Sequence, residues 1–153
     1  MKQLIEKILK AGTLLSTFGF IGSTLIQIYA RFFMDSAPSW TEEASRFFFV
    51  YAMSFAAGLA LKDNYYVYLD VLYAKLKSPA RRLVDISVHL TTIALFMVLG
   101  IYAIQYVVLG IPEKSPSLGF PMAVAFVSMV VMSLSIVIYA VYELKSSLNK
   151  KHD

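Results

Sequence analysis

Residues 39–61 read Ser-Trp-Thr-Glu-Glu-Ala-Ser-Arg-Phe-Phe-Phe-Val-Tyr-Ala-Met-Ser-Phe-Ala-Ala-Gly-Leu-Ala-Leu, and this stretch decides the fold class. Ser39 and, three residues later, Glu42 fit a capping box, in which a hydroxyl and a carboxylate satisfy free N–H groups of a helix start. Counted from Trp40 to Lys62, the helix reaches roughly 34 Å at about 1.5 Å per residue. It can cross a bilayer if its charged start lies at one membrane surface. The stretch therefore predicts a membrane-spanning helix with a charged end.

The charges at this helix start have helical spacing. Glu42 precedes Arg46 by four residues and Glu43 precedes it by three, so either carboxylate can meet the guanidinium on one helical face. One interpretation is a solvated helix start whose ion pair contributes a few tenths of a kcal/mol. The other is a contact with a second subunit at the membrane surface, because Trp40 and these charges stand directly before three phenylalanines. The candidate subunit-interface residues here are Trp40, Glu42, Glu43 and Arg46.

The rest of the chain also separates charge from apolar residues. Of 153 residues, 58% are hydrophobic and 16% are charged. The charge-free runs cover residues 11–30, 47–61, 86–112 and 115–142. Three of them reach the length of about 20 residues that a membrane span needs, and the run 47–61 reaches it with its charged cap. We predict an all-α membrane protein with one domain over 1–153 and four transmembrane helices over about 8–34, 39–61, 79–109 and 119–145.

The basic residues alternate between the two sides of the predicted helices. Three Lys or Arg precede the first helix, five lie between the second and third helices, and three follow the fourth, whereas the other two connections hold two and one. This pattern predicts that both termini and the connection over 62–85 lie in the cytoplasm. The first charge-free run is long for a signal peptide and has no Ala-x-Ala end, so we expect the first helix to stay uncleaved.

The connection over 62–85 has its own pattern. Large apolar and tyrosine side chains recur at steps of three and four over 65–77, which predicts an amphipathic helix on the cytoplasmic surface. On the other side, the proline-rich stretch 110–119 predicts a turn before the fourth helix.

Small and polar residues within the spans indicate helix contacts. Gly12, Ser16, Gly19 and Ser23 form one stripe of small residues, and Ala52, Ala56 and Ala60 form another. Such stripes allow close approach of helices in lipid, although small residues are also simply frequent in membrane spans. Gln27 and Gln105 fall at similar depth near the outer ends of their helices. They could hydrogen-bond to each other or to another chain, so both are candidate interface residues.

The sequence shows no recognisable catalytic, metal-binding or ion-coupling residues. No Asp, Glu, Lys or Arg lies inside a charge-free run, whereas a proton-coupled transporter needs an ionisable group within the membrane. The two histidines, His89 and His152, cannot form the buried pair that ligates a haem within one chain. There is no cysteine, nucleophile elbow, phosphate loop or metal-ligand spacing. We expect no enzymatic activity, cofactor or metal, and the basic surplus orients the protein without implying nucleic acid.

Three classes of function remain. The first is a non-catalytic subunit that offers surface to another membrane protein. The second is a free-standing small transporter or channel formed by self-association, with Gln27, Gln105 and the small-residue stripes lining a path. The third is a membrane enzyme subunit or cytochrome anchor, which the histidine count disfavours.

Two blocks of sequence carry a resemblance to a known family. They are Trp40-x-Glu42-Glu43-x-x-Arg46 before the second helix, and Lys62-Asp63 with Tyr66-Val67-Tyr68-Leu69-Asp70 after it. With the four-helix layout, the chain resembles the small membrane subunit, of the DctQ type, of tripartite ATP-independent periplasmic (TRAP) transporters. It departs from the family pattern at Tyr66, where a His usually stands, at Tyr51, where a Trp is frequent, and at Ala56, where a Gly is frequent. Asp70 keeps the acid and joins the interface candidates.

The resemblance implies a role in a sodium-coupled importer of organic acids in the bacterial inner membrane. Such a system uses a periplasmic substrate-binding protein and a large membrane subunit that carries the substrate and sodium sites. The small subunit is expected to brace the fixed scaffold of the large one. Sialic acid and C4-dicarboxylates are both compatible substrates.

Overall fold

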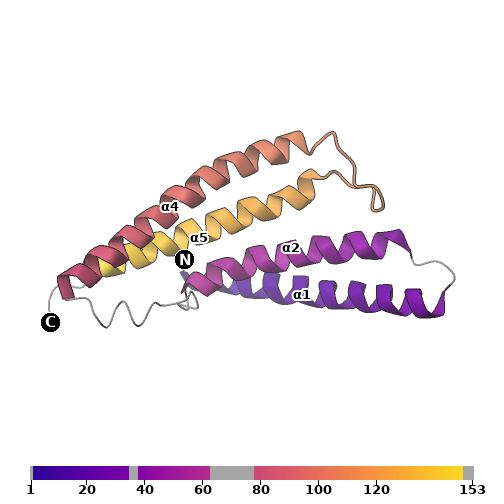
Figure 1. Cartoon of the computed structure of the whole chain (residues 1–153), viewed down its shortest axis with the longest axis horizontal. Coiled ribbons are helices and arrows are strands. Elements are labelled where there is room, and N and C mark those ends of the chain that lie inside the picture. The colour runs from indigo at the N-terminus through magenta and orange to yellow at the C-terminus, as the bar shows by residue number, and fades with distance from the viewer. Residues whose placement is uncertain (1, 35–37, 63–77, 150–153) are drawn as a thin grey trace.

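We describe a computed structural model of the chain, which covers residues 2–34, 38–62 and 78–149 (Figure 1). It consists of four helices: α1 (Lys2–Phe33), α2 (Ser39–Lys62), α4 (Ser78–Leu109) and α5 (Ala123–Asn149). All four are long and apolar enough to cross a membrane, which confirms the predicted all-α class with four spans. The amphipathic helix predicted over 65–77, and Asp70 within it, lie outside the described residues.

Three helix boundaries differ from the prediction by more than a turn, and one of them is the end of the last helix, at Asn149 instead of about residue 145. The first helix begins at Lys2 instead of about residue 8, and an i,i+4 ion pair between Glu6 and Lys10, at 2.7 Å, supports this added turn. The last helix begins at Ala123 instead of about residue 119, because the preceding residues form a loop in which Gly119 has a φ of 73°. A left-handed residue ends regular helix geometry, so α5 can start only after it.

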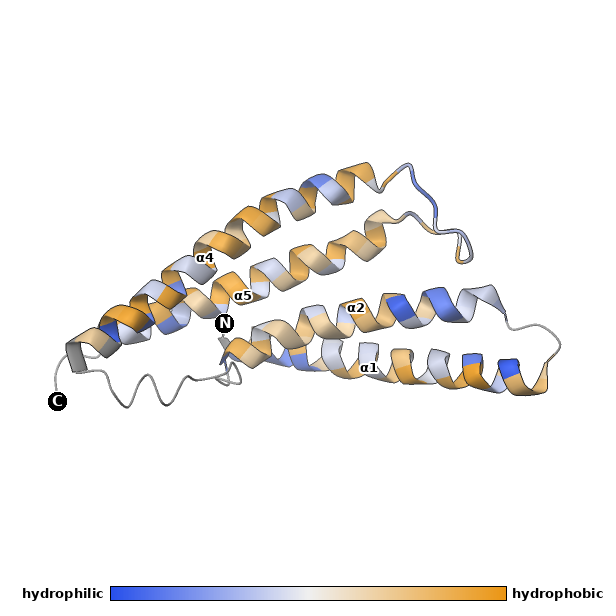
Figure 2. Ribbon diagram, in the orientation of Figure 1, coloured by the Kyte–Doolittle hydropathy of each residue, from blue (hydrophilic) through white to orange (hydrophobic). Residues whose placement is uncertain are grey.

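The helices form two hairpins that lie side by side. α1 packs on α2, α4 packs on α5, and α2 packs on α5, so the lateral order is α1, α2, α5, α4 (Figure 1). The two edge helices expose many large apolar side chains, as spans that face lipid do. Figure 2 shows that hydrophilic residues gather toward the helix ends and in the loop between α4 and α5.

Small residues hold the helices close together. A Cβ added to Gly12 would lie 2.8 Å from the ring of Phe55, and one added to Gly19 would lie 2.7 Å from the ring of Phe48. Ser16 and Ser23 of the same stripe are buried. The stripe that the sequence predicts on the first helix therefore lies in the interface with α2.

A third glycine brings α2 against α5. A Cβ at Gly58 would lie 2.6 Å from Cβ of Ser135. Nearer the starts of the same two helices, the Tyr51 hydroxyl donates to the Val124 carbonyl at 2.6 Å. α2 and α5 thus run parallel, with their starts at one end of the molecule. We call this the cap end and the opposite end the terminal end.

Ionic and polar contacts close the terminal end. Glu6 lies 2.7 Å from Lys62, which joins the start of α1 to the end of α2. Arg82 donates to the Leu148 carbonyl at 3.1 Å, which joins the start of α4 to the last turn of α5. Each hairpin is therefore fastened at its open end, and the cationic side chain of Arg82 lies at the negative end of the α5 dipole.

Candidate subunit-interface site

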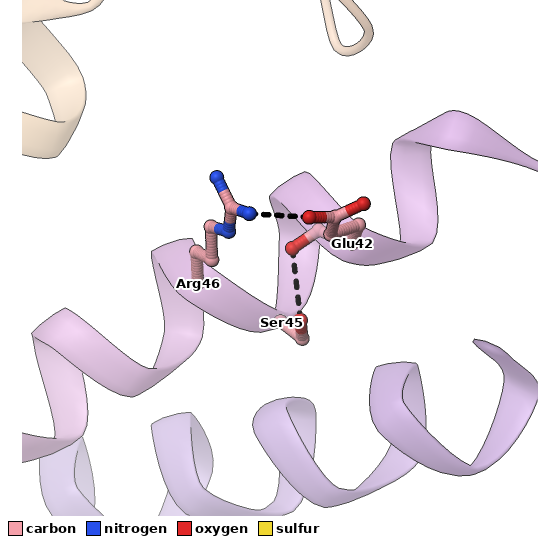
Figure 3. Close-up of polar contacts among 3 residues, drawn as sticks. All are labelled: Glu42, Ser45 and Arg46. Carbon is pink, nitrogen blue, oxygen red and sulfur yellow. Dashed lines mark hydrogen bonds and ion pairs between the residues drawn. The ribbon is translucent and has the colours of Figure 1, made fainter. Parts of the chain in front are cut away.

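The charged cap of α2 contains one ion pair within the helix. The Arg46 guanidinium donates to Glu42, four residues earlier, so the structure selects Glu42 from the two partners that spacing allows (Figure 3). The Ser45 hydroxyl donates to the Glu42 backbone carbonyl at 2.8 Å. Both charged side chains are open to the surroundings, at 77% exposure for Arg46 and 56% for Glu42. The pair is therefore positioned to meet a molecule outside this chain.

Glu43 has a different set of contacts, which the sequence does not reveal. Its carboxylate accepts from the Ser115 hydroxyl and from the backbone N–H groups of Ser117, at 2.9 Å, and Leu118, at 3.1 Å. Three donors around one carboxylate favour its ionised form. Glu43 therefore ties the start of α2 to the loop between α4 and α5.

The loop that Glu43 holds has its own internal order. Ser115 N–H donates to the Phe120 carbonyl at 2.9 Å, and Met122 N–H donates to the Glu113 carbonyl at 2.8 Å. The Phe120 ring contacts the Phe47 ring of α2 in an edge-to-face arrangement, with centroids 5.3 Å apart. The loop is thus a folded connection that packs on α2.

The helix start is satisfied differently from the predicted capping box. Thr41 donates twice to the Pro38 carbonyl, from its N–H at 3.2 Å and from its hydroxyl at 2.7 Å. Within residues 38–62, no hydrogen bond joins Ser39 to Glu42. The predicted capping box is therefore wrong, because the first turn of α2 closes on the Pro38 carbonyl and Ser39 already lies within the helix.

The remaining candidates are dispersed. Trp40 lies at the start of α2 and is 42% exposed. Gln27 is partly buried on α1, and Gln105 is exposed on α4. These two helices are at opposite edges of the layer, so the glutamines do not meet within one chain. The site that the structure assembles is thus the cap of α2 with the loop 113–122.

No cluster of metal-ligating residues is present in the ranges that the structure describes. His89, on α4, has a buried Nδ1 atom without a hydrogen-bond partner. It stands apart from the cap end, near the start of its helix.

Taken together, four membrane-length helices, a charged cap and a packed loop define a multi-pass membrane protein with a folded polar end. The family model for the DctQ component of tripartite ATP-independent periplasmic transporters matches residues 20–150, so the chain belongs to this family. A protein of Haemophilus influenzae, provisionally named a TRAP transporter small permease protein, is 24% identical over 131 residues, which cover 86% of this chain and 79% of that protein. The resemblance carried by the Trp40 to Arg46 block is thereby confirmed at the level of the family.

The contacts of Glu43 make a direct prediction about the loop. Glu43→Ala removes the acceptor for the Ser117 and Leu118 N–H groups, so we expect hydrogen exchange at these two amides to rise several-fold. Trypsin should also cut faster after Lys114, which is exposed in the same loop. Glu43→Gln should give a smaller change because an amide oxygen still accepts.

Glu113→Gln is the matched control, because Glu113 is an exposed carboxylate of the same loop. It should leave exchange and cleavage as in the wild type. Unchanged protection of residues 117 and 118 in Glu43→Ala would show that the loop is held by its own hydrogen bonds and the Phe120 contact alone.

Proposed function

We propose that this TRAP small permease subunit is a non-catalytic scaffold that braces the large membrane subunit of a sodium-coupled, binding-protein-dependent importer of an organic acid. The observation that carries the proposal is the exposed Glu42–Arg46 pair at the cap of α2. An ion pair held within one chain gains little at a surface. Contact with a second subunit gives the same two charges a function.

The distribution of charge supports a scaffold over a transporter that works alone. The four charge-free runs contain no ionisable residue other than tyrosine and His89, and His89 lies near the start of its helix. Coupled transport needs a group that binds or releases an ion within the membrane. In this proposal the large subunit supplies those groups, and the substrate is a carboxylate such as sialic acid or a C4-dicarboxylate.

The alternative, a homo-oligomeric transporter or channel, gains no support from the fold. Gln27 and Gln105 lie on α1 and α4, at opposite edges of the layer. Self-association could place both beside a path between chains, but the small-residue stripe of α1, which would line the same path, lies in the interface with α2. We therefore retain the scaffold as the proposed function.

The proposed setting is the bacterial inner membrane, with the cap end facing the periplasm. The large membrane subunit is the lateral partner, and a periplasmic substrate-binding protein is the third component. The excess of Lys and Arg in alternate connections supports this orientation.

Reporter fusions test the orientation. Fusions at the N-terminus, at residue 78 and at the C-terminus should report the cytoplasm, and fusions at residue 36 or 117 should report the periplasm. A periplasmic signal at residue 78 would overturn the orientation.

Reconstitution tests the function. Liposomes that contain this chain alone should take up organic acid at the rate of empty vesicles, with or without a sodium gradient. Liposomes that contain both membrane subunits and are supplied with the binding protein should show sodium-dependent uptake. Uptake by this chain alone, or full uptake by the large subunit without it, would contradict the scaffold.

A further inference from the structure

α1 lies at the edge of the layer, packs on α2 and leaves one side exposed along its whole length (Figure 1). The small residues from Gly12 to Ser23 pack on α2. At about 100° per residue, the exposed side is opposite them. We call it the outer face of α1, and its exposed residues recur at steps of three and four: Lys7, Lys10, Leu14, Phe18, Ile21, Leu25, Tyr29 and Phe32.

The order of residue types along the outer face matches the layers of a bilayer. Two lysines come first, apolar side chains follow, and Tyr29 and Phe32 come last, at 60% and 81% exposure. Nineteen positions separate Lys10 from Tyr29, about 28 Å of helix at ~1.5 Å per residue, against a hydrocarbon thickness of about 30 Å. Lysines and aromatic rings are the side chains that helices place at the two membrane surfaces. The outer face therefore has the profile of a helix side that lipid covers.

The two lysines lie at the depth of the lipid phosphates. The headgroup layer adds about 5–7 Å to each side of the hydrocarbon core. Lys10 directly precedes the charge-free run 11–30, and Lys7 lies three residues, about 4.5 Å, further out. Residues three apart are neighbours on one helical face, and both side chains are flexible. A phosphate at this level is therefore within reach of both ammonium groups.

The charge around these lysines is positive. Lys10 and Lys62 each place an ammonium nitrogen 2.7 Å from the same Glu6 oxygen, so one carboxylate serves two cations. Among the described residues, Lys7 forms no ion pair and adds a third cation. The Lys10 side chain is 57% exposed and has N–H donors beyond the one that meets Glu6. An acidic headgroup complements this surplus, whereas a zwitterionic headgroup brings a cation of its own.

We propose that Lys7 and Lys10 bind the headgroup phosphate of an acidic phospholipid whose acyl chains lie along the outer face of α1. Leu14 and Phe18, the first large apolar side chains below the lysines, contact the acyl chains. The ion pair with Glu6 keeps Lys10 at the membrane surface. This inference does not rest on the proposed scaffold function, because the ligand is lipid and the site belongs to this chain alone.

Lipid titration of the purified chain tests the site. The protein in detergent is titrated with phosphatidylglycerol or with phosphatidylcholine of the same acyl chains, and native mass spectrometry counts the bound lipid. Each lysine near a membrane surface strengthens binding to acidic lipid by about fivefold. Lys7→Gln should therefore weaken phosphatidylglycerol binding about fivefold, and Lys7→Gln/Lys10→Gln roughly 25-fold, with phosphatidylcholine binding unchanged. Lys7→Gln leaves both ion pairs of Glu6 in place, so its circular dichroism should match that of the wild type.

Lys114→Gln/Lys145→Gln is the matched control, because it removes two exposed cations from other parts of the chain. It should bind phosphatidylglycerol as the wild type does. Wild-type affinity in both variants of the outer face, or an equal loss in the control, would overturn the site. Equal affinity of the wild type for the two lipids would overturn it as well.

The same titration on the complex with the large subunit distinguishes lipid from protein as the occupant of this face. The variants should rank as they do in the single chain. Phosphatidylglycerol binding that no longer depends on Lys7 and Lys10 in the complex would show that the large subunit covers the outer face, and would overturn the proposal. Failure of the wild-type chains to co-purify would contradict the scaffold function and leave the lipid site to the single-chain result.

Discussion

Arg46→Ala is expected to release this subunit from its large partner. At a desolvated interface, loss of one member of a hydrogen-bonded charge pair costs about 2–5 kcal/mol, which weakens association by roughly 30-fold or more. An exposed pair that serves only α2 would cost less than about 1 kcal/mol and leave assembly intact. Co-purification of the two subunits and sodium-dependent uptake by the reconstituted complex measure the difference.

Three variants make this result specific. Arg46→Lys should restore assembly only in part, because a point charge does not reproduce the planar fork of guanidinium donors. Lys145→Ala removes an exposed cation near the end of α5, at the terminal end of the molecule and away from the cap of α2, and should assemble as the wild type does. Wild-type assembly and uptake in both Arg46→Ala and the Glu42→Gln/Glu43→Gln double variant would refute the inter-subunit role of the cluster.

Gly58→Ala is expected to destabilise the fold itself. The added methyl group would lie 2.6 Å from Cβ of Ser135 and 3.3 Å from its backbone carbonyl carbon, so α2 and α5 have to move apart. Overpacking of this kind typically costs about 1–3 kcal/mol. Unfolding in mixed micelles, followed by circular dichroism, measures the change in free energy.

The matched control is Gly22→Ala, which adds the same methyl group to α1 where nothing lies within 4 Å. It should be neutral or stabilise by up to about 1 kcal/mol, since alanine is the better helix former. Ser135→Gly should recover part of the Gly58→Ala loss, because it removes the side chain that the methyl group meets. Equal stability of the two alanine variants would show that α2 and α5 do not pack as described.

The sequence predicts the helices better than it predicts the site. Long runs without charge identify four spans because burial of a charge in lipid is costly whatever the neighbours are. The sequence places the start of α5 about four residues too early, since the charge-free run passes through Gly119 and Pro121 without a break. Backbone geometry in the loop, which hydropathy does not report, sets that boundary.

Within the site, local spacing predicts only local contacts. It allows Arg46 two partners, and the structure selects one. The donors to Glu43 lie 72 to 75 residues away in the chain, so no periodicity could have indicated them. Glu42 pairs within its own helix and stays exposed, whereas the adjacent Glu43 accepts hydrogen bonds from the loop. Tertiary packing sets this difference.

The pairing of α1 with α2 and of α4 with α5 has a consequence for biogenesis. Chains emerge from the ribosome starting at the N-terminus, and each hairpin pairs helices that are consecutive spans. The first hairpin can therefore associate in the bilayer while the second is still being translated. Contacts of Gly58 and Glu43 form only after the first hairpin is made, because both wait for residues beyond 114. A nascent chain arrested before Ser115 would contain the paired helices α1 and α2. The side of α2 that contacts α5 in the full chain would still be uncovered.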